Sequence, residues 1–332
     1  MRPRTRGRGP LWLLVGVVVV LALFAVDALA PEAFAQSLPT RAQDGITLAL
    51  SVLLESLPFV ALGVVLSVVV QVWVPPGALE RWMPRRAWAR RAVLSLLGML
   101  IPVCECGNVP FARGLMIRGF AVSDTLTFLV AAPIVNPIVI ITTHAAFGWS
   151  DGILVARLIG GFLVANLIGW LYSRHPDPDA LLTDRFRATC EIPDGGQRGG
   201  RMQRSIAQFV VELRSVMPAL VIGSAIAGAV QVIVPRSALL AIGSDPALSI
   251  ATMILLAVIV SICSNVDAFF ALSFASTFTP GSLVAFLLVG PLVDVKMLAL
   301  LRTTFTTRVL VGMVLIVVSA AFALGTVVNL LA

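Results

Sequence analysis

Long apolar stretches separated by clusters of arginine constrain this chain more than any other feature of its sequence. Most of them reach the roughly 20 residues that a helix needs to cross about 30 Å of hydrocarbon. Apolar residues make up 58% of the chain and charged residues only 12%, about half the charged fraction of a soluble domain. The sequence therefore predicts an all-α polytopic membrane protein in contact with membrane lipid, with little room outside the bilayer for a soluble enzyme.

The arginine clusters predict the orientation of the chain. Four arginines precede an apolar run at 11–26, so residues 1–35 are typical of a signal anchor or a signal peptide. Further clusters at 81–91 and 174–204 are typical of cytoplasmic loops. We therefore expect a multi-pass protein of the bacterial cytoplasmic (inner) membrane, with the N-terminus and the 173–205 linker in the cytoplasm. Because these arginines account for the net charge of +7, the charge does not indicate nucleic-acid binding.

The two sides of the linker repeat one another. Pro58 matches Pro218 at an offset of 160, and Cys-Gly-Asn-Val at 106–109 matches Cys-Ser-Asn-Val at 263–266 at an offset of 157. The expected domains are an N-terminal signal anchor or signal peptide (1–35), a first membrane repeat (46–172), a cytoplasmic linker (173–205) and a second membrane repeat (206–331).

The arginine clusters require an even number of crossings between them, but three apolar elements lie there, at 92–120, 121–147 and 152–172. Prolines and a Cys-Glu-Cys-Gly-Asn motif break the first element, so we expect it to be a re-entrant hairpin that does not cross. The equivalent element at 248–278 then enters from the other side. Each repeat has three transmembrane helices plus one broken re-entrant hairpin, and the repeats are inverted, a design found in transporters.

The first break holds the sharpest candidate site, Cys104-Glu105-Cys106. Residues two apart diverge in a helix, but in an unwound segment two thiols and a carboxylate could face one soft metal or metalloid. Cys104 and Cys106 are therefore candidate metal ligands, and Cys263 lies at the repeat-related position. The alternative is that small, buried cysteines pack a tight hairpin.

Polar residues beside the breaks are further candidates for substrate binding or coupling. Asn108 and Asn265 are repeat-related and either cap a half-helix or hydrogen-bond a substrate. Asp267 is costly in hydrocarbon unless it is paired or wet.

A second polar group lies in the apolar span after Pro291. Asp294 and Lys296 either carry a coupling proton or form a structural ion pair, and Asn136 takes the place of Asp294 in the first repeat. No nucleophile elbow, phosphate-binding loop or dinucleotide fingerprint occurs in the sequence. We therefore expect neither an enzyme nor a bound cofactor, and an ATP-driven mechanism would need a partner chain.

Three motifs resemble a known family. They are Val-Cys-Glu-Cys-Gly-Asn-Val-Pro (103–110), Phe-Leu-Val-Ala-Ala-Pro-Ile-Val-Asn-Pro (128–137) and Gly-Pro-Leu-Val-Asp-Val-Lys (290–296). They are similar to those of the YraQ/YcgR/ArsP-type predicted permeases, and the likeness covers roughly 46–331. It implies a permease of the cytoplasmic membrane. Some relatives export trivalent organoarsenicals, but those branches more often have Cys-Ser-Cys where this chain has Glu105 in the middle, so the resemblance does not imply that cargo.

The leading hypothesis is a secondary exporter of a small molecule or ion, with soft metals and metalloid compounds among the candidates, that works by alternating access. The alternative is a membrane subunit of a larger permease or assembly complex with no transport activity alone. That alternative predicts an exposed small-residue face at Gly223–Gly228 for a partner subunit or further copies of the chain. A thiol oxidoreductase is a third class. It is disfavoured because His144 and His175 are the only histidines, too few for a haem or quinone ligand cluster.

Overall fold

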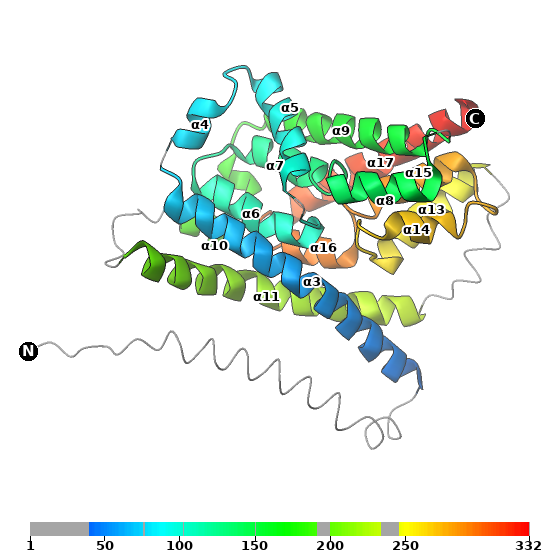
Figure 1. Ribbon diagram of the computed structural model, residues 1–332, viewed down its shortest axis with the longest axis horizontal. Coiled ribbons are helices and arrows are strands. Elements are labelled where there is room, and N and C mark those ends of the chain that lie inside the picture. Colours follow the sequence, from blue (N-terminus) through cyan, green and yellow to red (C-terminus); the bar gives the residue numbers. More distant parts are fainter. Residues whose placement is uncertain are drawn as a thin grey trace, which may run out of the picture.

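A computed structural model describes residues 40–75, 77–101, 103–149, 151–190, 200–233 and 246–331 (Figure 1). The expected signal segment at 1–35 lies outside these residues. The described chain is helical and contains no strand beyond one isolated bridge. Four of its helices are long and apolar enough to cross a membrane: α3 (Thr40–Trp73), α9 (Ile153–Tyr172), α11 (Arg201–Ile233) and α17 (Thr307–Leu331). The chain is therefore a multi-pass membrane protein.

Shorter helices lie between the four long ones. They are α4 (Ala78–Trp82), α5 (Ala87–Leu97), α6 (Glu105–Ile117), α7 (Val122–Ala131), α8 (Pro137–Phe147), α10 (Asp184–Cys190), α13 (Pro246–Val260), α14 (Asp267–Leu272), α15 (Pro280–Val289) and α16 (Val295–Leu301). Both breaks expected from the sequence are present. The first break lies between α5 and α6, and the second break lies between α13 and α14.

The segment 121–147, expected as one continuous crossing, is instead divided between α7 and α8. Asn136 lies at the break with an extended backbone (φ −100°, ψ 136°), because a residue that precedes proline is pushed out of the helical region. The second half is divided at the equivalent place, where Asp294 is extended (φ −107°, ψ 164°) between α15 and α16. Each half therefore contains two long helices and two broken segments.

Helices α3 and α11 lie side by side and run antiparallel (Figure 1). The indole nitrogen of Trp73, at the end of α3, donates to Ser205 Oγ near the start of α11 at 3.2 Å. At the opposite ends, Gly228 packs directly against the backbone of Gly45 and Ala49.

The small-residue face of α11 was expected to be exposed, but its glycines are buried inside the protein. Gly223 packs against α16, where an added Cβ would lie 2.9 Å from Ala299 Cβ, and Gly228 packs against α3. The prediction of a partner-binding face at Gly223–Gly228 is therefore wrong, because these glycines permit close packing between helices of the same chain.

The same helix pairs pack together in both halves. Helix α7 contacts α5 and α9, and α15 contacts α13 and α17. The long helices α9 and α17 are also antiparallel, since Tyr172 Oη at the end of α9 donates to the carbonyl of Val309 at the start of α17 at 2.9 Å. All nine residues from Gly281 to Val289 in α15 are buried, so this short helix lies in the core.

Part of the linker between the two halves is folded. Phe186 of α10 is buried, and the amide of Thr183 donates to the carbonyl of Thr304 at 2.9 Å. Residues 179–190 therefore pack on the turn that precedes α17.

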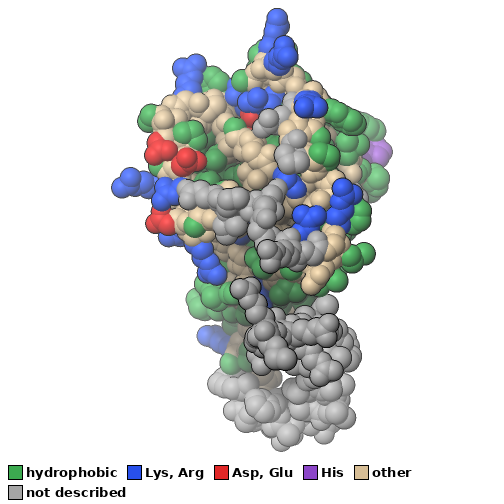
Figure 2. All heavy atoms as spheres, turned by 90° about the vertical axis from the view of Figure 1, so that its left-hand side faces the viewer, with side chains coloured by type: hydrophobic (Ala, Val, Ile, Leu, Met, Phe, Trp, Pro, Cys, Tyr) green, Lys and Arg blue, Asp and Glu red, His purple; other side chains and the backbone are tan. Residues whose placement is uncertain are grey.

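One end of the molecule holds α4, α10 and the start of α11, and we call it the arginine-bearing end. Figure 2 looks at this end and shows basic side chains distributed over it, together with several acidic ones. The described arginines of the two clusters thus lie at the same end, the arrangement that the positive-inside rule requires of two cytoplasmic loops.

Candidate functional site

Two glycines bring the first break against α3. A Cβ added to Gly63 would lie 2.0 Å from the carbonyl oxygen of Gly107, and one added to Gly107 would lie 2.4 Å from that of Phe59. Helix α6 begins just beyond the break, with Cys104 as its N-cap residue in an extended conformation (φ −71°, ψ 174°). Of the expected unwound motif, only Cys104 lies outside regular helix, whereas Glu105 and Cys106 form the first turn of α6.

Three thiols lie around the carboxylate of Glu105, where the first break meets the second. The thiol of Cys263, in the second break, donates to Glu105 Oε2 at 3.8 Å. Cys106 Sγ lies 3.7 Å from Ser56 Oγ on α3. The ligand atoms of Cys104, Glu105 and Cys106 all lie within 4.8 Å of one another. Thiolates are the ligands that favour soft cations, and with the carboxylate they make this group a candidate metal site.

Glu105 joins the first break to the second half of the chain. Its carboxylate accepts from Ser264 Oγ at 3.0 Å and from Lys296 Nζ at 3.2 Å. Lys296 Nζ also lies 4.0 Å from Asp294 Oδ2. All three ionisable side chains are buried. Two carboxylates therefore share one ammonium group, which leaves an excess negative charge if all three are ionised.

Asn136 and Asp294 perform the same local task in the two halves. Asn136 Oδ1 accepts from the amide of Ile138 at 2.9 Å, and Asp294 Oδ1 accepts from the amide of Met297. Each side chain thus caps the helix after a break. Asn136 also donates to the carbonyl of Val103 at 3.0 Å, so it fixes the backbone next to Cys104.

Neither Asn108 nor Asn265 caps a helix through its side chain. Cys104 is the N-cap of α6 and Val266 that of α14. Among the described residues, both polar atoms of the Asn108 amide and Oδ1 of Asn265 are buried without a hydrogen-bond partner. A buried polar group left unsatisfied costs about 1–3 kcal/mol, a cost that a polar ligand at the site would remove.

Asp267 takes part in an ion pair that the sequence analysis did not anticipate. Its two carboxylate oxygens accept from Arg157 of α9 at 3.0 and 2.6 Å, and Arg157 also donates to Thr143 at 2.8 Å. Both charged groups are buried. An arginine within the apolar run 152–172 was the available signal for this pair. It anchors the second break to the first half of the chain.

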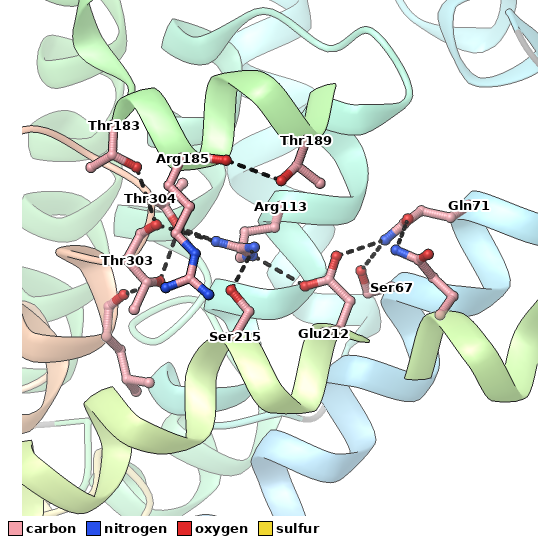
Figure 3. A network of polar contacts seen from close by, with 12 residues as sticks. Ser67, Gln71, Arg113, Thr183, Arg185, Thr189, Glu212, Ser215, Thr303 and Thr304 are labelled. Atoms are coloured by element: carbon pink, nitrogen blue, oxygen red, sulfur yellow. Dashed lines mark hydrogen bonds and ion pairs between the residues drawn. The ribbon is translucent and has the colours of Figure 1, made fainter. Parts of the chain in front are cut away.

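A separate polar network lies on the side of the arginine-bearing end (Figure 3). Arg113 of α6 donates to Glu212 at 3.1 Å and to Ser215 at 3.0 Å, both on α11. Its guanidinium also lies 4.4 Å from the ring centroid of Phe186. Gln71 of α3 donates to Glu212 at 3.3 Å. This network, also missed by the sequence analysis, ties α3, α6, α10 and α11 together.

The fold and the site define a class of protein: a multi-pass membrane protein with a buried polar site where two broken helical segments meet. Residues 42–330 match the family ArsP_1, described as predicted permease. The chain therefore belongs to this family of predicted permeases.

Curated relatives agree with the family assignment. The chain is 37% identical to the UPF0718 protein YcgR of Bacillus subtilis over 78% of the chain and 88% of the relative. It is 33% identical to a protein of Streptococcus mutans named putative two-component membrane permease complex subunit, over 82% of the chain and 90% of the relative. The UPF0718 protein YraQ of Escherichia coli is 26% identical over 52% of the chain and 48% of the relative. No solved structure matches the chain.

Proposed function

We propose that this permease moves a small thiophilic cation, a soft metal ion or a metalloid compound, through the buried site formed by Cys104, Glu105, Cys106 and Cys263. The observation that carries the proposal is the position of three free, buried thiols around one buried carboxylate, that of Glu105. Thiolate and carboxylate ligands together suit a soft divalent cation or a metalloid.

Lys296 would compete with a cargo cation for the carboxylate of Glu105. In the structure its ammonium group lies against Glu105, and a cargo cation at the thiols would compete for the same carboxylate. We assign Lys296 and Asp294 to coupling on this ground. The unpartnered amide of Asn108 is a further polar group for the cargo.

The transport mechanism that we propose is alternating access between two inverted halves, with export as the direction and the arginine-bearing end in the cytoplasm. The antiparallel packing of α3 on α11 and of α9 on α17 supports it, since helices related by an inverted repeat run in opposite directions. Broken helices at membrane depth support it as well, because unpaired backbone is tolerated there only in a protein interior or a wet cavity.

Binding of cadmium ion to the purified protein in detergent tests the proposal. We expect wild type to bind one ion at the thiol cluster, with thiolate-to-metal absorption, and Cys104→Ser/Cys106→Ser to lose that absorption. Cys190→Ser is the matched control, because Cys190 lies in α10, away from the cluster. Equal absorption in wild type and the double variant would exclude the two thiols as ligands.

A second candidate function is a membrane subunit that transports only together with a partner. The name of the Streptococcus mutans relative, a putative two-component membrane permease complex subunit, favours it. Under this reading cadmium still binds to the purified chain, but proteoliposomes that contain the chain alone show no uptake, and co-purification of a second membrane protein restores it.

A further inference from the structure

A cavity of about 340 Å³ lies beside the second break, between α3, the end of α11 and the start of α14. Its polar lining comes from Ser51, Glu55, Gln231 and Ser261. Gln231 Nε2 donates to the carbonyl of Val260, the last residue of α13, at 2.9 Å, so the side chain satisfies a helix end that the break would leave open.

The cavity reaches the walls of the thiol site. Ser261 and Ile262 line it and directly precede Cys263. On the other wall, the carbonyl of Val52 accepts a hydrogen bond from Ser56 at 2.7 Å, and Ser56 Oγ is the group that contacts the thiol of Cys106. The cavity and the site are therefore separated by about one residue on the second break and one helical turn on α3.

Glu55 is an exposed carboxylate near the middle of the 34-residue helix α3. It has no hydrogen-bond or ion-pair partner among the described residues. A charged side chain at the centre of a transmembrane helix costs about 2.5–3.5 kcal/mol on insertion scales. This cost falls where water or a cation reaches the group, and the cavity that Glu55 lines provides such a place.

The repeat relates this cavity to the Arg113 network of Figure 3. At the offset of 160, Glu55 corresponds to Ser215, Val52 to Glu212 and Gln231 to Gln71. At the offset of 157 that aligns Cys106 with Cys263, Phe270 in the cavity wall corresponds to Arg113.

One location is therefore filled by a buried ion-pair network and the equivalent location by an open space. Because α3 and α11 are antiparallel, the network and the cavity lie toward opposite ends of these helices. The two halves thus differ where alternating access would require one side to be closed and the other open.

We infer that the cavity is the open access route between the buried site and the membrane face opposite the arginine-bearing end, with Glu55 as its cation-attracting carboxylate, and that the Arg113–Glu212 network closes the repeat-related route. The nature of the cation rests on the proposed function. The access route itself does not.

Cysteine accessibility tests the route without any cargo. The four native cysteines are replaced by serine, and single cysteines are introduced as Glu55→Cys, Ser215→Cys and Leu54→Cys. Ser215 is the repeat-related control, and Leu54, exposed on the same helix at 51% but outside the cavity lining, is the lipid-facing control. A charged, membrane-impermeant methanethiosulfonate reagent is added outside intact cells.

We expect Glu55→Cys to react at least about tenfold faster than both controls, because a thiol in a wet cavity ionises and one in lipid does not. Equal rates for Glu55→Cys and Leu54→Cys, or fast reaction of Ser215→Cys from the same side, would overturn the inference. If the cysteine-free chain is not monodisperse, the same variants are labelled in the wild-type background, where three buried thiols and the partly buried Cys190 set the baseline.

The outcomes separate this inference from the proposed function. Fast labelling in a protein that binds no cadmium would refute the proposed cargo and leave the access route standing. Cadmium binding at the thiols with an unreactive Glu55→Cys would refute the access route alone.

Discussion

The buried ion pair between Arg157 and Asp267 gives a quantitative test of how the two halves are held together. Asp267→Asn removes the negative charge with little change in volume and leaves the Arg157 guanidinium, which is fully buried, without its counter-charge. Removing one partner of a buried pair costs about 3–5 kcal/mol. With a shift of about 2–3 °C per kcal/mol, the unfolding midpoint should fall by roughly 6–15 °C.

The surface pair Arg187–Asp184 is a matched control. Its nitrogen–oxygen distance is 2.6 Å, equal to that of Arg157–Asp267, but its side chains are 41% and 94% exposed. Exposed pairs contribute about 0–1 kcal/mol, so Asp184→Asn should shift the midpoint by no more than about 3 °C. The assay is thermal unfolding in detergent followed by intrinsic tryptophan fluorescence.

A double substitution measures the interaction between Arg157 and Asp267 separately from the effect of each single substitution. Arg157→Leu with Asp267→Asn removes both charges and should be more stable than the sum of the single losses predicts, by at least about 2 kcal/mol. The reasoning is refuted if Asp267→Asn is as stable as Asp184→Asn, or if the losses of the two single variants add.

Three further predictions concern stability and the charge balance of the site. Gly63→Ala should lower the free energy of unfolding by about 1–3 kcal/mol, because the added Cβ meets the α6 backbone. Gly200→Ala, with open space around the added Cβ, should change the unfolding midpoint little. Asn136→Ala removes a helix cap and a buried bond to Val103 and should cost about 1–3 kcal/mol in the same unfolding assay. Lys296→Met should lower the unfolding midpoint by leaving Glu105 unpaired, and adding Glu105→Gln should restore most of the loss; failure of that rescue would argue against the ion pair.

The sequence was enough to predict the two breaks, because a Cys-Gly-Asn-Val motif interrupts the first apolar element and a Cys-Ser-Asn-Val motif interrupts the second. It also placed Asn136 opposite Asp294, and the structure shows both as helix caps. These features are local, so they depend only on residues near in the chain. The division of 121–147 was missed although Asn136-Pro137 was a readable signal, because the apolar run gave no change in composition there.

The ion pairs could not be predicted in the same way. Arg157 and Asp267 are 110 residues apart and Arg113 and Glu212 are 99 apart. Their pairing depends on how helices from different parts of the chain pack, which apolar periodicity does not specify. The sequence showed that such charges needed partners, and the structure identified them.

Uptake of cadmium into proteoliposomes is the most direct test of the central claim that the thiol–carboxylate site carries the cargo. Wild type, Cys190→Ser and Cys104→Ser/Cys106→Ser are reconstituted at equal density. The account predicts uptake by the first two and none above protein-free vesicles for the third. Undiminished uptake by Cys104→Ser/Cys106→Ser would contradict it.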